Sequence, residues 1–213
     1  MSIADRTQAL RESLPQGVDL IAVSKTHPTQ AIEDAYAGGQ RHFGESYAQE
    51  LRDKAPALPS DIHWHFIGKI QRNKLKYIAP HAYRVHGLTK LNQAEELVKR
   101  APGPVSGLIN VNLGREASKV GVFPEDVLSL AASLHQVDGF QLCGLMCIPP
   151  FTEVPEDVAP WFEELADLAA RGRAAGLPLT ELSMGMSRDW KVAVAHGARW
   201  IRVGTALFGA RGT

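Results

Sequence analysis

The sequence predicts an α/β protein that folds as a single (β/α)₈ barrel of the TIM type, with residues 1–213 forming one domain. Eight short apolar runs alternate with longer stretches of helical character, a pattern that is typical of parallel sheets. Eight such units predict closure into a barrel, although ~250 residues is more usual for that fold. The runs at 63–68 and 142–148 are almost continuously apolar, as expected for strands covered on both faces. A doubly wound open sheet is the structural alternative.

The expected elements follow one another along the chain, with proline or glycine at many of the joins. A first helix is expected at Ile3–Ser13, before any strand. The eight expected strands are Leu20–Ser24, His42–Gly44, His63–Gly68, Arg84–Gly87, Gly107–Leu113, Leu142–Ile148, Glu181–Met184 and Trp200–Val203. The helices between them are expected at Gln30–Ala37, Tyr47–Lys54, Asn73–Ile78, Leu91–Lys99, Pro124–Leu134, Pro160–Ala175 and Trp190–His196.

The composition excludes several classes of protein. The 23 basic and 23 acidic side chains balance to a net charge of zero, whereas binding of bulk nucleic acid requires a basic excess. No run approaches the ~18 apolar residues of a membrane span, and the N-terminus does not resemble a signal peptide. We therefore expect a cytoplasmic protein with neither a nucleic-acid nor a membrane partner.

The two cysteines are expected to be free thiols. Cys143 and Cys147 are the only cysteines in the chain, and four residues of strand would separate them by ~13 Å. A disulfide requires Cα atoms within about 7 Å of each other. A metal site is a poor alternative because no further histidine or cysteine lies nearby in the sequence, so both side chains are expected in the core.

Polar residues at the ends of the expected strands identify where the chemistry could lie, since barrels carry their active sites at the carboxyl ends of their strands. These positions are Lys25, Glu45, Ser46, His65, Asn112, Met146, the segment Ser183–Ser187 and the segment Arg202–Thr205. Lys25 directly follows a buried run, and desolvation there would lower the pKa of its amine and favour the neutral nucleophile that a Schiff base requires. The alternative is a lysine that extends along apolar surface to reach solvent.

The last two expected strands end in small residues and hydroxyl groups. Ser183, Ser187, Gly204 and Thr205 lie there, and barrels frequently bind phosphate at this place through backbone N–H groups and a helix N-terminus. The alternative for Ser187 is a capping role for the helix expected to start near Asp189.

Arg202 lies two residues before Gly204, on the same side of its strand, and is expected to point into the barrel. A buried arginine requires an acceptor. That acceptor is either Glu45, or another carboxylate, or the pyridine nitrogen of a bound cofactor.

His63 and His65 flank Trp64 with strand spacing, and with no third ligand a metal site is not expected. The basic stretch 69–76 is expected to begin a solvated helix.

Seven segments together resemble one known family, the pyridoxal phosphate homeostasis proteins. They are Ala22–Pro28, Phe43–Glu50, Trp64–Gly68, Gln71–Lys74, Gly144–Pro149, Leu182–Ser187 and Arg202–Gly209, in order over nearly the whole chain. The resemblance implies a single barrel similar to the N-terminal domain of alanine racemase. It also implies that pyridoxal 5′-phosphate (PLP) is bound through Lys25 as a Schiff base, with the phosphate at the ends of the last two strands and Arg202 facing the pyridine nitrogen.

The expected cofactor-binding residues are Lys25, Ser46, His65, Met146, Ser183, Met184, Ser187, Arg202, Gly204 and Thr205. No catalytic residue and no metal site are expected. Two departures from the family pattern concern Ser46, where the family usually has asparagine, and the segment 197–199, where it often has Gly-Ser-Thr. The first puts any ring contact of residue 46 in question, and the second lies away from the expected site.

The resemblance implies a PLP-binding protein that buffers or delivers PLP in the cell, with apo-forms of PLP-dependent enzymes as candidate recipients. A PLP-dependent amino-acid racemase of the alanine racemase type is the alternative. A two-base racemase needs a second proton-transfer group opposite the lysine, and of the four tyrosines only Tyr47 lies near a strand end. The C-terminal domain that assembles alanine racemase dimers is expected to be absent, so we expect a monomer, with a weak dimer as the alternative.

Overall fold

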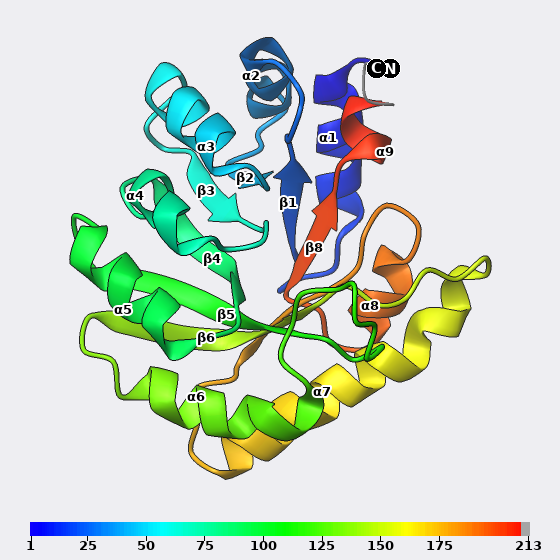
Figure 1. Ribbon diagram of the computed structural model, residues 1–213. Helices are drawn as coiled ribbons and strands as arrows, with labels where there is room; N and C mark the ends of the chain where they lie inside the picture. The colour runs from blue at the N-terminus through cyan, green and yellow to red at the C-terminus, as the bar shows by residue number, and fades with distance from the viewer. Residues whose placement is uncertain (210–213) are drawn as a thin grey trace.

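The computed structural model describes residues 1–209, and its eight parallel strands close into a barrel in the order β1 to β8 (Figure 1). The strands are β1 (Asp19–Val23), β2 (His42–Glu45), β3 (His63–Phe66), β4 (Ala82–Leu88), β5 (Val105–Val111), β6 (Phe140–Cys147), β7 (Glu181–Ser183) and β8 (Trp200–Val203). β8 pairs with both β7 and β1. The predicted barrel is therefore confirmed, and the open sheet is excluded.

Helices follow the strands and form the outer layer of the barrel (Figure 1). They are α1 (Ile3–Ser13), α2 (Thr29–Ala37), α3 (Ala48–Lys54), α4 (Leu75–Ile78), α5 (Leu91–Arg100), α6 (Val127–His135), α7 (Ala159–Ala174), α8 (Trp190–Ala195) and α9 (Thr205–Phe208). The short helix α9 is an addition to the predicted elements. It packs beside α1, where Arg6 Nε donates to the carbonyl of Leu207 at 2.7 Å. This contact joins the first and the last helix of the described chain.

The apolar core lies mainly between the strands and this helical layer. Side chains alternate along each strand, so Ala22, Phe43 and Phe66 face the helices and are fully or almost fully buried. The alternate positions face the barrel axis. Ile21 is paired in register with Arg202 on β8, which places residues of this parity, and Lys25 after them, on the inner side.

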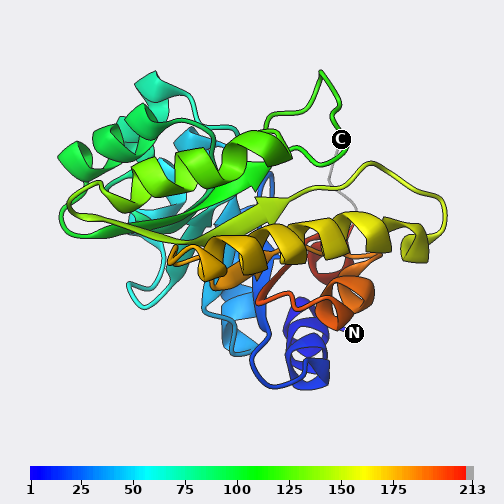
Figure 2. The same cartoon turned by 90° about the horizontal axis from the view of Figure 1, so that it is seen from below.

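The segment between β6 and α7 extends beyond the barrel (Figure 2). It contains residues 148–158, and Phe151 within it is 79% exposed.

The cysteines lie in β6 as buried free thiols, as predicted. Within residues 1–209, no helix has both the length and the apolar character needed to cross a membrane.

Candidate functional site

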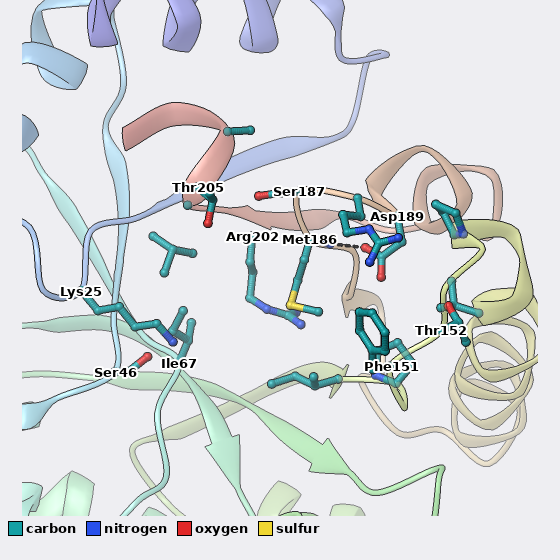
Figure 3. Close-up of a pocket in the computed structure, with 18 of the residues that line it drawn as sticks. Lys25, Ser46, Ile67, Phe151, Thr152, Met186, Ser187, Asp189, Arg202 and Thr205 are labelled. Carbon is teal, nitrogen blue, oxygen red and sulfur yellow. Dashed lines mark hydrogen bonds between the residues drawn. The ribbon is translucent and has the colours of Figure 1, made fainter. Parts of the chain in front are cut away.

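A cavity of about 740 Å³ lies at the carboxyl ends of β1, β2 and β8, on the face where barrels carry their chemistry. This volume is that of a small-molecule site, for which ~300–1,000 Å³ is typical. Most of the lining is apolar, and a few polar groups converge within it (Figure 3). The polar or charged lining residues are Lys25, His27, Ser46, Lys119, Thr152, Ser187, Arg188, Asp189, Arg202 and Thr205.

Lys25 reaches the cavity because of its position in the chain. β1 ends at Val23, and the alternation of side chains along the strand continues through Ser24, which is fully buried, to a half-buried Lys25. Figure 3 shows the Lys25 side chain crossing the cavity edge beside Ser46 and Ile67. A primary amine is therefore held at the mouth of the barrel, with Ser46 on the adjacent strand end.

Arg202 forms the floor of the cavity. It is 4% exposed, and its guanidinium donates to Ser183 Oγ at 2.7 Å and to the carbonyl of Cys147 at 2.8 Å. Burial lowers the pKa of this guanidinium from its usual value. No carboxylate within residues 1–209 forms an ion pair with it, so the predicted alternative partner, Glu45, is wrong; Glu45 contacts Lys54 instead.

Two buried histidines, His86 and His65, and the half-buried His42 continue from Arg202 toward the opposite end of the barrel. His86 Nδ1 lies 2.9 Å from Ser183 Oγ, His86 Nε2 lies 2.8 Å from His65 Nδ1, and His65 Nε2 lies 3.0 Å from His42 Nδ1. We call His42, His65 and His86 the histidine chain. Burial lowers the pKa of all three, that of His42 to about 4, and all three are therefore neutral at physiological pH.

Ser187 and Thr205 provide hydroxyl groups on a second wall of the cavity (Figure 3). Thr205 is the first residue of α9 and Gly204 precedes it, so the first N–H groups of this helix have no partner within the helix. The alternative role of Ser187 as a helix cap is wrong, because α8 begins at Trp190 and Asp189 occupies the cap position. Ser187 is thereby left on the cavity wall.

The structure brings six of the ten predicted site residues together and leaves four outside the lining. Those that line the cavity are Lys25, Ser46, Ser187, Arg202, Gly204 and Thr205. His65, Met146 and Ser183 lie inside the barrel, whereas Met184 belongs to the apolar core on the helix side, and all four are fully or almost fully buried. Of these four, Ser183 and His65 reach the cavity only indirectly, through the hydrogen bonds that lead to Arg202.

Sequence reasoning did not identify the 148–155 segment as part of the site. Ile148, Phe151 and Thr152 line the cavity, and Arg188 Nη2 donates to the carbonyl of Glu153 at 2.7 Å, which ties this segment to the residues before α8. The run of prolines after an apolar strand was the available signal. It indicated a loop on the face that carries the chemistry, but not which residues of the loop line the cavity.

A second group that sequence reasoning did not assemble lies behind Lys25. Lys54 Nζ is 2.8 Å from Glu45 Oε1 and 2.6 Å from Glu50 Oε2, and we call these three residues the Lys54 cluster. Burial raises the pKa of Glu45 to about 7, although the neighbouring Lys54 and a hydrogen bond from Ser24 lower it.

The family model described as "Alanine racemase, N-terminal domain" matches residues 1–212. A protein from Pseudomonas aeruginosa named pyridoxal phosphate homeostasis protein is 43% identical over 201 residues, which are 92% of this chain and 86% of that protein. A protein of the same name from Aquifex aeolicus is 40% identical over 98% of this chain and 95% of its own length.

Solved structures show the same similarity. PipY from Synechococcus elongatus, determined with PLP bound, is 41% identical with a TM-score of 0.88, and the match covers 98% of this chain and all of PipY. Alanine racemase from Corynebacterium glutamicum has a TM-score of 0.76 at 16% identity, over 98% of this chain and 61% of the enzyme. The likeness to the racemase is one of fold alone.

Proposed function

The chain belongs to the family of pyridoxal phosphate homeostasis proteins, built on the alanine racemase N-terminal domain, and from that premise we propose that it binds PLP in the cavity described above. The observation that carries the proposal is the presence of Lys25 and Arg202 in one cavity of suitable size. The PLP bound in PipY supports it, since PipY is 41% identical to this chain over nearly its full length.

The donors of the cavity fit this cofactor. The aldehyde of PLP combines with a primary amine, and its phosphate and ring nitrogen accept hydrogen bonds. Lys25 supplies the amine, while Ser187, Thr205 and the first N–H groups of α9 supply donors for an anion. Arg202 is a buried guanidinium that donates to two neutral acceptors, Ser183 Oγ and the Cys147 carbonyl, and its five N–H donors allow a further hydrogen bond to the ring nitrogen.

Each residue then has a defined task. Lys25 would hold the cofactor covalently through Nζ as a Schiff base, and Ser187, Gly204 and Thr205 would bind the phosphate. Arg202 would donate to the ring nitrogen, and because an arginine is not deprotonated in proteins, that nitrogen would stay an acceptor. Ser46, beside Lys25, would contact the cofactor from the β2 side. His65, Met146 and Ser183 would act from beneath, by supporting Arg202 and the barrel interior, and Met184 would act from the apolar core behind β7.

We further propose that the protein holds and releases PLP in cellular PLP homeostasis, with PLP-dependent apo-enzymes as recipients, and does not turn over amino acids. The names of the relatives support the first part. The second part is supported by the cavity lining, in which the residues described include no tyrosine. Tyr47 is 54% exposed outside the lining, whereas a two-base racemase needs a second proton-transfer group opposite the lysine. A cytoplasmic location and a monomeric state stay predictions.

The experiment is to titrate purified protein with PLP, follow the absorbance of the bound cofactor, reduce with borohydride and locate the modified lysine by mass spectrometry. We expect the label on Lys25, and its loss in both Lys25→Ala and Lys25→Arg, because the arginine keeps the charge but not the primary amine. Lys69→Ala, on the same face but outside this cavity, is the matched control. A reducible adduct at full occupancy in both Lys25 variants would contradict the proposal.

A further inference from the structure

The backbone on both sides of Lys25 is held by hydrogen bonds from the Lys54 cluster. Before Lys25, Ser24 Oγ donates to Glu45 Oε1 at 2.8 Å, and the carbonyl of Ser24 accepts from Lys54 Nζ at 3.0 Å. After Lys25, the N–H of Thr26 donates to Glu50 Oε2 at 2.8 Å. The three residues of the cluster thus contact the two chain neighbours of Lys25.

Thr26 adopts a backbone conformation that is unfavourable for threonine. Its φ is 65°, in the left-handed region that is costly for a β-branched residue. Such a conformation persists where surrounding contacts enforce it, and the bond from Thr26 N–H to Glu50 is a contact of this kind. The direction in which the chain leaves Lys25 therefore depends on Glu50.

Lys54 joins the two halves of this arrangement. It is only 8% exposed, and its ammonium contacts Glu45, Glu50 and the carbonyl of Ser24. Glu45 is fully buried, and its Oε2 has no hydrogen-bond partner among the residues described. Lys54 is accordingly the charge that compensates Glu45, and a buried carboxylate deprived of such a partner is strongly destabilising.

The cluster lies on the opposite side of the strands from the cavity. Ser24 and Glu45 alternate with the inward-facing residues of β1 and β2 and point toward the helical layer, and Glu45, Glu50 and Lys54 are absent from the cavity lining. The contacts of the cluster with Ser24 and Thr26 link it to the backbone that carries Lys25.

We propose that Lys54 is a positioning residue, which through Glu45 and Glu50 holds the Ser24–Thr26 backbone in the one conformation that aims the Lys25 amine into the cavity. This inference rests on the proposed function, because it takes Lys25 as the residue that holds PLP. It assigns a role to residues that contact neither the cavity nor its occupant.

The experiment compares full-length wild type with Lys54→Met, Glu50→Ala and Arg84→Met. Arg84 is the matched control, since it is 7% exposed and forms an ion pair with Glu181 at the opposite end of the barrel. We expect Lys54→Met to weaken PLP binding by about tenfold and to speed amide hydrogen exchange across residues 19–28 in PLP-free protein. Arg84→Met should lower the melting temperature and leave both readouts at the wild-type value.

The Glu50 variant provides a rescue test and also remains informative if Lys54→Met does not fold. We expect Glu50→Ala to weaken PLP binding by roughly five- to tenfold. Thr26→Gly added to Glu50→Ala should restore most of this affinity, because glycine adopts a positive φ without strain. A merely stabilising role of the cluster would lower the melting temperature of Glu50→Ala but give no recovery of affinity with Thr26→Gly.

Three results would overturn the inference. They are wild-type affinity and exchange in the variants of the cluster, an equal loss of affinity in Arg84→Met, and no recovery in the Thr26→Gly double variant. Failure of the proposed function has a different signature, because wild type itself would then carry no borohydride-trapped PLP on Lys25. The exchange measurement, which uses no PLP, still decides whether Lys54 holds the segment in that case.

Discussion

At the scale of single residues, the buried carboxylate of Glu45 has the clearest measurable consequence. Its folded-state pKa of about 7 lies above the usual 4.5, so between these pH values the folded protein retains a proton that the unfolded chain has released. The contribution of Glu45 to the free energy of unfolding is therefore full below pH 4.5 and is lost as the pH rises to about 7. The loss amounts to at most about 3 kcal/mol.

We expect Glu45→Gln to flatten this part of the pH dependence. Glutamine keeps the shape of the side chain and does not titrate. Denaturant unfolding of wild type and Glu45→Gln between pH 4.5 and 7.5 measures the free energy of unfolding at each pH. The slopes against pH are compared, because the absolute stability of the variant also reflects an amide facing Lys54. Parallel slopes would show that Glu45 does not titrate in this range.

Thr205 offers a test of the phosphate wall. Thr205→Val keeps the volume of the side chain and removes the hydroxyl group, and loss of a hydrogen bond to a charged group costs ~1.5–3 kcal/mol, or roughly tenfold or more in affinity. Pyridoxal, which lacks the phosphate, should bind weakly and respond little to the change. Titration of wild type and Thr205→Val with PLP and with pyridoxal measures the four affinities. Equal affinity of wild type for pyridoxal and PLP would contradict phosphate binding at this wall.

The residues of the site differ in how far the sequence could reveal them. Lys25 could be predicted because it directly follows a buried strand, and Arg202 because strand alternation places it on the inner side. Lys54 could not, because its position at the end of a helix resembles that of any solvated lysine, and its burial depends on how closely α3 packs against β1 and β2. Ser183 was predicted from its hydroxyl group, and the structure places it between Arg202 and His86. Its contact with phosphate stays a prediction.

At the scale of the elements, the contact between β6 and β7 depends on a glycine. A Cβ added at Gly144 would lie 1.8 Å from the backbone carbonyl oxygen of Glu181, and backbone cannot move aside as a side chain can. We expect Gly144→Ala to destabilise the protein by about 3 kcal/mol or more. Gly103→Ala is the control, since nothing lies within 4 Å of its added Cβ, and chemical denaturation of both variants measures the difference.

The order and type of the elements could be predicted more fully than their ends. All eight strands exist, because apolar runs separated by helical stretches leave little choice of fold. The expected strand Glu181–Met184 ends one residue earlier in β7, and α4 is a single turn after a 3₁₀ segment at Arg72–Lys74. Helix α9 was missed because four residues carry no periodic signal. The cap near Asp189 was misassigned because serine and aspartate are both good cap residues.

At the scale of the whole molecule, the proposed role as a PLP carrier predicts slow chemistry at Cα of amino acids. General acid–base assistance contributes ~10²–10⁴-fold in rate, and the lining residues described offer the amines of Lys25 and Lys119 but no tyrosine. Incubation of the PLP-loaded protein with alanine or serine in D₂O measures deuterium incorporation at Cα. We expect it to stay well below ~1 s⁻¹, the lower end of typical enzyme turnover, and a faster rate would favour the racemase alternative.

The histidine chain couples the two ends of the barrel, because the hydrogen bonds of Arg202 determine the tautomer of each histidine up to His42. Arg202 donates to Ser183 Oγ, and the Ser183 hydroxyl proton has one acceptor within residues 1–209, His86 Nδ1. His86 must then carry its proton on Nε2, and the same logic passes through His65 to His42. Every imidazole dipole along the axis consequently points the same way. The ¹⁵N NMR shifts of His42, at the end remote from the cavity, therefore depend on the hydrogen bond from Arg202 to Ser183. Arg202→Leu should abolish the common orientation of the imidazole dipoles and leave His42 as a mixture of tautomers.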